Sequence, residues 1–327
     1  MAGNSSKINM VMYHYVRPIK GSRYPKIKGL EYKLFEEQID FLRKNFQIIR
    51  VEDVLEQLQQ SRYTMPENAC LLTFDDGYTD HYEYVYPLLR KYHLQGSFYV
   101  PGKILVEDAV LDVNKIHFIL AGGQPVEQIV QKLFTILDEY REAGADIDSN
   151  EALFAKLAVA NRFDPKEVIF VKRLLQNGLP EKIRNEITSR LFAECMQKDE
   201  REFSKELYIR MDQMQEMKKD GMFFGLHSYS HYWLGKLSAD KMREDTEKSL
   251  KAMAPVIDMD NWVMNYPYGS EGAYNDDVLS YVKSRGCKMG LVTDAGVADL
   301  EKDNPYLLPR FDTNDFPPKS ENYKNFR

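Results

Sequence analysis

The chain is poor in cysteine and has no long apolar run. It holds three cysteines, far apart and without a Cys-x-x-Cys pair: Cys70, Cys195 and Cys287. This odd number of scattered thiols excludes a disulfide framework and a thiolate zinc site, so we expect three buried free thiols. The longest apolar runs, such as 69–74 and 222–226, are far too short to span a membrane.

Excess positive charge is also lacking. The net charge is -6, with both signs spread along the chain. The sequence therefore has no cluster of basic residues that could bind a phosphate backbone, and we expect no nucleic-acid partner. The amino terminus shows neither the apolar stretch nor the small-residue cleavage site of a secretory signal, so we expect a cytoplasmic protein. The 327 residues suffice for an α/β barrel with an insertion.

Short apolar runs, rich in β-branched and aromatic residues, predict strands that are buried on both faces. They lie at 8–13, 70–74, 97–100, 222–226, 262–266 and 289–293. Amphipathic helices are predicted between most of these strands, at 32–45, 51–59, 84–92, 239–253 and 276–284. Strands that alternate with helices favour parallel βα units, closed as a barrel or open and doubly wound.

One long stretch breaks this alternation, because helical patterns follow one another without a strand. Pro125 begins one predicted helix. Asp164, in a capping-box pattern with Glu167, begins another that ends at Gly178. We predict a barrel domain over 1–110 and 201–327 and a helical insertion over 111–200.

Carboxylates and imidazoles gather just after two predicted strands. Asp75 and Asp76 are adjacent, and burying both is costly unless a cation or proton compensates, although Asp-Asp-Gly is equally ordinary turn chemistry. His227 and His231 are four residues apart and can bind one ion in cis, although two histidines can also be surface or core residues. Together with Asp76 they form a set that is typical of catalytic zinc sites, with positions left open for water and substrate.

A third candidate segment, 265–270, follows the strand predicted at 262–266. Its Pro267 and Gly269 stiffen a turn that could project an aromatic ring and a backbone N–H into a cleft. A simple β-turn explains the pattern equally well.

Two of these segments carry a resemblance to a known family. Thr-Phe-Asp-Asp-Gly-Tyr at 73–78 and His-Ser-Tyr-Ser-His at 227–231 resemble the first two motifs of the polysaccharide deacetylases, carbohydrate esterase family 4. The similarity extends to Met-Tyr-His-Tyr-Val at 12–16 and covers roughly 8–110 and 212–312, but not the insertion. It implies a distorted (β/α) barrel with fewer than eight repeats that binds one divalent metal ion, expected to be Zn²⁺.

The resemblance also implies roles for single residues. By position, Asp75 would be the general base, and Tyr268 would lend its backbone N–H to the oxyanion. Three residues would bind the metal: Asp76, His227 and His231. From the same motifs we expect three residues to contact substrate: Tyr78, Asn265 and Tyr266.

The chain departs from the family pattern in two places. The third motif often carries an arginine where this chain has Asn265, and the late Leu-x-His motif, which supplies the catalytic acid, is not recognisable at 290–294. Candidates for the missing functions are His14, which could equally be a strand-end imidazole bonded to the backbone, and Arg310, as a partner that tunes Asp75. The remaining histidines are expected on the surface or in helices: His81, His93 and His117.

The leading hypothesis is a metal-dependent hydrolase that removes an N-acyl group, expected to be acetyl, from an amino sugar in surface polysaccharide or glycan biosynthesis. Without an export signal, a nucleotide-linked or lipid-linked sugar is the expected substrate, and the insertion would cover the cleft or form a homodimer contact. The alternative is a degenerate deacetylase that only binds glycan. A phosphate-ester hydrolase is disfavoured, because ligands for a second metal are lacking.

Overall fold

The structure is a computed structural model and describes residues 5–60, 62–160 and 164–326. The chain divides into two compact units. The barrel unit combines Met1–Pro18, Gly29–Glu107 and Lys205–Arg327, and the helical unit combines Ile19–Lys28 and Asp108–Ser204. The helical unit therefore takes in a segment, Ile19–Lys28, that the predicted insertion does not contain.

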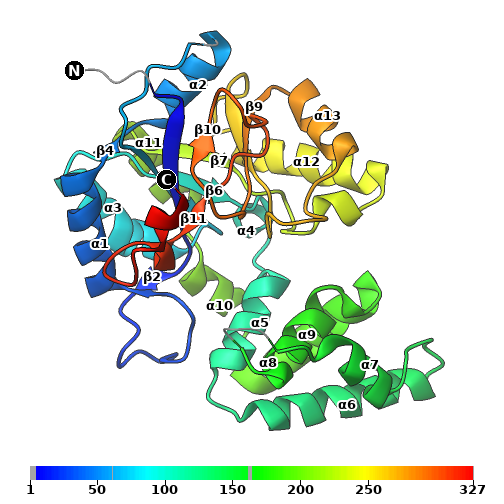
Figure 1. Ribbon diagram of the computed structural model, residues 1–327. Coiled ribbons are helices and arrows are strands. Elements are labelled where there is room, and N and C mark those ends of the chain that lie inside the picture. Colours follow the sequence, from blue (N-terminus) through cyan, green and yellow to red (C-terminus); the bar gives the residue numbers. More distant parts are fainter. Residues whose placement is uncertain (1–4, 61, 161–163, 327) are drawn as a thin grey trace. The chain divides into compact units, whose positions relative to one another are not determined.

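The barrel unit is built on a curled sheet with helices on its outer side (Figure 1). Its neighbouring parallel strands follow one another in the order β1 (Lys7–Tyr13), β5 (Ala69–Asp75), β6 (Ser97–Val100), β7 (Phe223–Leu226), β8 (Trp262–Asn265) and β9 (Cys287–Leu291). These are the strands that the apolar runs predicted. The distorted (β/α) barrel with fewer than eight repeats is thus confirmed.

A segment near the end of the chain lies between the first and last strands of this row. Leu308 forms a parallel bridge with Leu291 of β9, and β11 (Phe311–Asp312) pairs in parallel with β1. Arg310 lies between these two contacts. Further short strands were not predicted, because two residues carry no periodic signal: β2 (Val16–Arg17), β3 (Leu30–Glu31), β4 (Gln47–Ile48) and β10 (Ala298–Asp299).

The helices predicted for the barrel unit are all present: α1 (Tyr32–Asn45), α2 (Val51–Gln60), α3 (Tyr86–Lys91), α12 (Ala239–Met253) and α13 (Asp276–Ser284). Ser238 caps α12 by accepting the N–H of Lys241, and Asn275 caps α13 by accepting that of Val278. Shorter elements complete the unit: the π-helical turn η1 (His81–Val85), α4 (Lys103–Val106), α11 (Met211–Lys219), η3 (Leu234–Lys236), η4 (Thr313–Asp315) and η5 (Asn322–Phe326).

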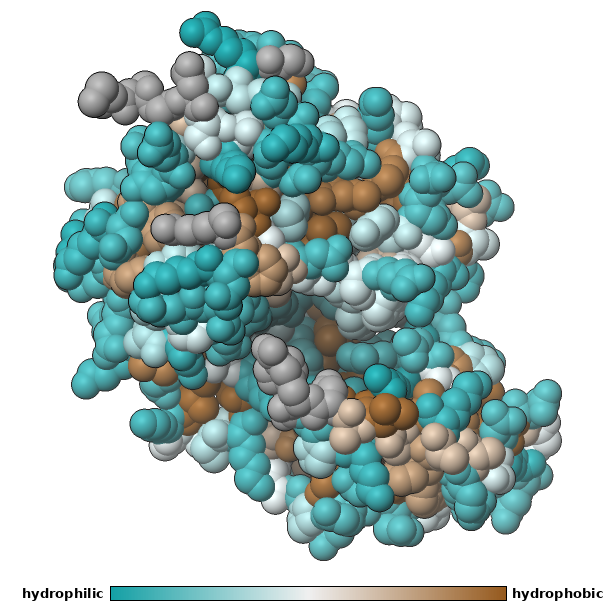
Figure 2. Space-filling view, in the orientation of Figure 1, coloured by the Kyte–Doolittle hydropathy of each residue, from teal (hydrophilic) through white to brown (hydrophobic). Residues whose placement is uncertain are grey.

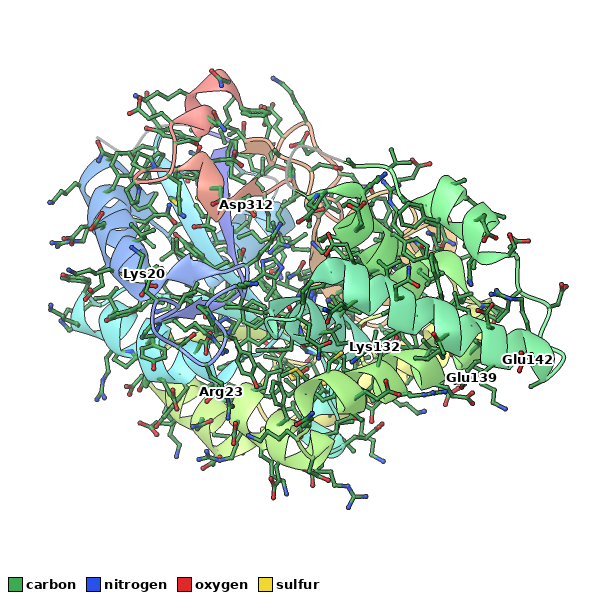
Figure 3. All side chains as sticks on the ribbon, turned by 90° about the horizontal axis from the view of Figure 1, so that it is seen from below. Lys20, Arg23, Lys132, Glu139, Glu142 and Asp312 are labelled. Atoms are coloured by element: carbon green, nitrogen blue, oxygen red, sulfur yellow. The ribbon has the colours of Figure 1, made fainter. Side chains whose placement is uncertain are left out.

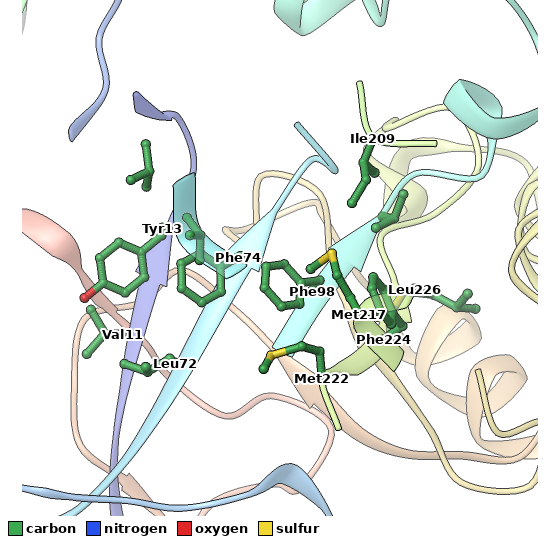
Figure 4. Close-up of a cluster of buried hydrophobic side chains, with 14 of the residues drawn as sticks. Val11, Tyr13, Leu72, Phe74, Phe98, Ile209, Met217, Met222, Phe224 and Leu226 are labelled. Carbon is green, nitrogen blue, oxygen red and sulfur yellow. The ribbon is translucent and has the colours of Figure 1, made fainter. Parts of the chain in front are cut away.

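A row of aromatic side chains identifies the outer face of the sheet. Tyr13, Phe74, Phe98 and Phe224 occupy one row of the sheet register, and their rings lie side by side (Figure 4). Side chains alternate along a strand, so the residue after Phe74 points to the opposite face. Asp75, at the carboxyl end of β5, therefore faces the barrel interior.

The interior changes from apolar to polar along the strands. A buried cluster fills the part nearer their amino ends with residues that include Met10, Leu71, Val263 and Met289. Gly225 makes room for the ring of Tyr99 there, because a Cβ at this position would lie 2.6 Å from that ring. Toward the carboxyl ends the inward-facing residues are polar and fully buried: Thr73, Asn265 and Arg310.

The helical unit consists of α5 (Asp112–Ala121), α6 (Val126–Glu142), α7 (Asn150–Leu157), α8 (Lys166–Arg173), η2 (Leu174–Gly178) and α9 (Glu181–Met196), and α10 (Glu200–Leu207) leads back to the barrel unit. In α6, Leu133 and Leu137 are buried, whereas Lys132, Glu139 and Glu142 spread along the helix as charged positions (Figure 3).

The predicted capping box at the start of α8 is wrong. The N-cap position is Pro165, and no side chain caps the helix. Asp164 instead accepts a hydrogen bond from Lys172 of α8, 2.8 Å away, and pairs with Lys28. The predicted end at Gly178 is confirmed.

Hydrophilic residues cover most of the surface on the face shown in Figure 2. Within the described residues, none of the helices is both long and apolar enough to cross a membrane. Two of the thiols, Cys70 and Cys287, are buried as expected, but Cys195 of α9 is only partly buried. The predicted homodimer contact stays a prediction.

Candidate active site

The candidate residues lie where neighbouring strands of the barrel end. Asp75 is the last residue of β5, and His227 directly follows β7. The turns after these strands and after β8 contain four of the six described non-glycine residues with positive φ: Asp76 (75°), Ser228 (57°), His231 (56°) and Tyr268 (64°). Such backbone is rare for these residue types and is concentrated at functional sites.

Asp76, His227 and His231 come together in a buried cluster. Oδ1 of Asp76 lies 3.4 Å from Nε2 of His227 and 3.2 Å from Nε2 of His231. The three ligand atoms lie within 4.8 Å of one another. This spacing lets one ion contact all three.

The chemistry of these atoms fits a divalent cation. Oδ1 of Asp76 is buried without a hydrogen-bond partner, an arrangement that calls for an explanation such as an ion. Nδ1 of His227 is 2.6 Å from the carbonyl oxygen of Asn265 and donates to it, which leaves the Nε2 lone pair facing the cluster. No lysine or arginine in the described part of the chain pairs with Asp76. Two imidazoles and one carboxylate suit Zn²⁺ and related transition metals.

Helix α12 holds the turn that contains both histidines. Asp245 accepts the backbone N–H of Tyr229 at 2.7 Å and that of Ser230 at 3.0 Å. Ser249, one helical turn further on, donates to the carbonyl of Ser228 at 2.9 Å. Sequence reasoning missed Asp245 and Ser249, because a polar residue on an amphipathic helix gives no signal that it faces inward.

Arg310 holds Asp75 in place. Its guanidinium donates to both carboxylate oxygens of Asp75, each at 2.9 Å. The remaining N–H groups donate to Thr73, Asn265 and the carbonyl of Val292, so all five donors of the arginine are used. Arg310, in the segment next to β11, thus contacts Asn265, which stands where the third motif often carries an arginine.

The carboxyl group of Asp75 is ionised at neutral pH. Burial by itself would raise the pKa of Asp75, but the Arg310 guanidinium, assisted by His14 and His227, outweighs it and lowers the pKa to about 2. Asp75 is therefore available to accept a proton.

His14 lies near Asp75 and is partly exposed. Its Nε2 is 3.9 Å from Oδ2 of Asp75, and 41% of its side chain is exposed. Its backbone carbonyl accepts a hydrogen bond from Nε2 of His81 at 2.9 Å. His81 lies in a helical segment, as expected, but it is buried rather than exposed, and burial lowers its pKa to about 4. His93, by contrast, is exposed.

Tyr268 lies next to the metal-ligand candidates. Its ring is 4.9 Å from the ring of His231 and stacks on Trp233 at 4.5 Å. Its carbonyl accepts a hydrogen bond from Thr293 at 2.9 Å, which fixes the left-handed turn.

The three predicted substrate contacts are buried in the structure, and their role stays a prediction. Tyr78, Asn265 and Tyr266 are fully buried. The phenol of Tyr78 donates to Asp76, and Asn265 accepts from Arg310 at 2.9 Å. Tyr78 and Asn265 are thus bonded to other site residues, whereas Tyr266 lies in a buried hydrophobic cluster.

Comparisons with known proteins agree with this geometry. The family model described as polysaccharide deacetylase matches residues 62–149 and 186–290, more than half of the chain. A relative, the polysaccharide-deacetylase-like protein YxkH of Bacillus subtilis (strain 168), is 34% identical over 100 residues, which are 30% of this chain. The match spans only 33% of that relative's length.

Solved structures share the fold over nearly the whole chain. Deacetylase PplD of Streptococcus pyogenes, in complex with acetate, has a TM-score of 0.58 at 17% identity and covers 98% of this chain and 96% of its own. IcaB from Ammonifex degensii has a TM-score of 0.56 at 15% identity and covers 96% of this chain and 95% of its own. Because the family model matches more than half of the chain and spans both strand-end motifs, the chain belongs to the polysaccharide deacetylase family.

Proposed function

We propose that this protein is a metal-dependent hydrolase that removes N-acetyl groups from amino sugars in a surface polysaccharide or a related glycan. The observation that carries the proposal is the buried set of Asp76, His227 and His231 beside a second carboxylate, Asp75, which Arg310 keeps ionised. A binding protein has no use for two desolvated carboxylates at such a position.

The three ligand candidates would hold one divalent ion, expected to be Zn²⁺. Such an ion supplies Lewis-acid chemistry: it polarises an acyl carbonyl and makes water more acidic. The chain's own residues would carry the remaining steps of amide hydrolysis.

Asp75 is placed to accept the proton of a water molecule that attacks the acyl carbon. The attack converts the carbonyl oxygen to an oxyanion, and the backbone N–H of Tyr268 is the candidate donor that stabilises it. When the carbon–nitrogen bond breaks, the leaving amine needs a proton. His14, partly exposed and 3.9 Å from Asp75, is the candidate donor. The products are acetate and the free amino sugar.

The test combines metal analysis with product analysis. Untagged protein is assayed for bound metal and for acetate release from N-acetylated monosaccharides, nucleotide sugars, short glycans and polymers, before and after chelation. We expect one equivalent of metal and acetate release that chelation abolishes and added Zn²⁺ restores.

Other outcomes have definite meanings. Metal without acetate from any compound would contradict removal of acetyl groups and direct attention to other acyl groups. Absence of both metal and acetate release would favour a degenerate protein that binds glycan. The expected cytoplasmic nucleotide-linked or lipid-linked substrate stays a prediction, and acetate release from polymers alone would contradict it.

A further inference from the structure

The two carboxylate oxygens of Asp76 have different surroundings. Oδ1 faces Nε2 of both His227 and His231 and has no hydrogen-bond partner. Oδ2 accepts a hydrogen bond from the phenol of Tyr78. One carboxylate oxygen therefore faces the two histidines, and the other is hydrogen-bonded to Tyr78.

The backbone leaves Tyr78 little freedom to move away from Asp76. Asp76 and Gly77 both have left-handed backbone, with φ of 75° and 67°, and these two residues turn the chain back beneath the carboxylate. A side chain at Gly77 would not fit, because its Cβ would lie 2.8 Å from Val100. After the turn, Tyr78 forms an antiparallel bridge with Tyr208.

A second phenol supports the first. The ring of Tyr15 stacks on that of Tyr78 with centroids 3.9 Å apart, and the two hydroxyl groups are hydrogen-bonded to each other. A phenol has one hydrogen, and Tyr78 gives its own to Asp76. The hydrogen between the two phenols is therefore the one of Tyr15. Both tyrosines are buried, so water does not compete with this chain of hydrogen bonds.

We propose that Tyr78, supported by Tyr15, restricts Asp76 to metal binding through Oδ1 alone and thereby sets the metal preference of the site. This inference rests on the proposed metal-dependent function. With one carboxylate oxygen and two imidazoles, the protein supplies three ligand atoms, as in catalytic zinc sites. A carboxylate that binds through both oxygens would favour larger ions with more oxygen ligands, such as Mn²⁺. Tyr78 is in this sense a positioning residue.

The experiment compares metal binding by the metal-free full chain and by three variants: Tyr78→Phe, Tyr15→Phe and Tyr82→Phe. The last is a matched control, because it removes a phenol-to-carboxylate hydrogen bond, to Glu216 at 2.8 Å, that lies away from the cluster. Titrations with Zn²⁺ and Mn²⁺ give affinities, and the visible spectrum of bound Co²⁺ reports its coordination number.

In the Tyr78→Phe variant we expect affinity for Zn²⁺ to fall about 10- to 100-fold. Affinity for Mn²⁺ should fall less, and the Co²⁺ bands should weaken toward those of a six-coordinate ion. Tyr15→Phe should shift the same quantities in the same direction by less, and Tyr82→Phe should match the unmodified chain. If Tyr78→Phe does not fold, as judged by its melting without metal, the Tyr15→Phe result decides the question.

Two results overturn the inference, and they are distinguishable. If the unmodified chain binds no metal, the proposed function fails together with it. If the unmodified chain binds metal and Tyr78→Phe keeps the same ratio of Zn²⁺ to Mn²⁺ affinity and the same Co²⁺ spectrum, only the role of Tyr78 fails.

Discussion

At the scale of single residues, the site depends on a charge pair between distant parts of the chain. Asp75 and Arg310 are 235 residues apart in sequence, yet they form a bidentate pair in which both side chains are buried. A guanidinium whose five N–H groups all have acceptors cannot easily turn away. The pair therefore fixes the direction of the Asp75 carboxylate as well as its charge.

Replacing Arg310 by methionine tests this pair through the pH dependence of stability. In the unmodified chain the pKa of Asp75 is about 2, below its ordinary value of 3.8, so Asp75 contributes stability that is present above about pH 4 and lost as the pH falls toward 2. Without the guanidinium, burial raises this pKa. The variant should lose about 3–5 kcal/mol at pH 7, and its deficit should shrink as the pH falls to 3.5.

The measurement is denaturant unfolding of both proteins at pH 7, 5 and 3.5. Arg243→Met is the control, since Arg243 and its partner Asp240 are exposed, and its effect should stay within about 0.5 kcal/mol. A deficit of Arg310→Met that is constant with pH would mean that packing, rather than the ionisation of Asp75, accounts for the loss.

Substitutions should also distinguish Asp75, the candidate general base, from the candidate metal ligands. Asp75→Asn should abolish turnover and keep the metal, because Asp75 is bonded to Arg310 and lies outside the ligand cluster. His227→Ala should lose both metal and turnover. Metal content and acetate release are measured on the same preparations. Equal metal loss in both variants would make Asp75 a ligand.

At the scale of elements, the strands place the site and the turns after them shape it. Alternation along β5 turns Asp75 inward, opposite the outer row of aromatic rings. The turn after β7 then needs support from outside the sheet, and α12 provides it through Asp245 and Ser249. The geometry of the candidate metal ligands therefore depends on a strand and a helix that are separate in sequence.

Strand packing can be tested at Gly225 in β7. A Cβ there would lie 2.6 Å from the Tyr99 ring and 2.8 Å from the carbonyl oxygen of Val263, so Gly225→Ala should destabilise the protein by about 1–3 kcal/mol. Gly296→Ala is the control, because its nearest neighbour would be Pro309 at 3.5 Å. Melting and denaturant unfolding measure both variants. Equal stability of the two would contradict close packing of Tyr99 against β7.

At the scale of the whole molecule, the barrel unit and the helical unit carry different thiols. Cys70 and Cys287 belong to the barrel unit, where both are buried, and burial raises the pKa of Cys287 to about 12 and raises that of Cys70 as well. Cys195 belongs to the helical unit and is partly exposed.

The rate at which each thiol is labelled should therefore report the opening of the unit that contains it. In the native protein a maleimide should modify Cys195 first, and modification of Cys70 and Cys287 should require opening of the barrel unit. Mass spectrometry of digested samples, taken across a denaturant series, measures each site. Equal rates at all three sites without denaturant would show that the barrel core is not closed to the reagent.

The sequence by itself determined the main strands and helices of the barrel unit and a candidate ligand set. Runs of buried apolar residues predicted the strands of the barrel because burial on both faces leaves a continuous signal. Asp76, His227 and His231 were predictable as candidate ligands because the motifs are local: they lie within a few residues after predicted strands, and parallel strands bring their carboxyl ends to the same edge.

Only the tertiary structure decided which residues support the site. Arg310 contacts Asp75 from a segment that joins the sheet only at Leu308 and at β11. Asp245 contacts the turn with the two histidines from helix α12, and Tyr78 lies under Asp76 and donates to it. None of these arrangements follows from a local pattern. The contacts of Arg310 and Asp245 join groups that are distant in sequence. Tyr78 meets Asp76, only two residues away, because Asp76 and Gly77 have left-handed backbone. In each case burial excludes water, so the protein itself must satisfy the hydrogen bonds.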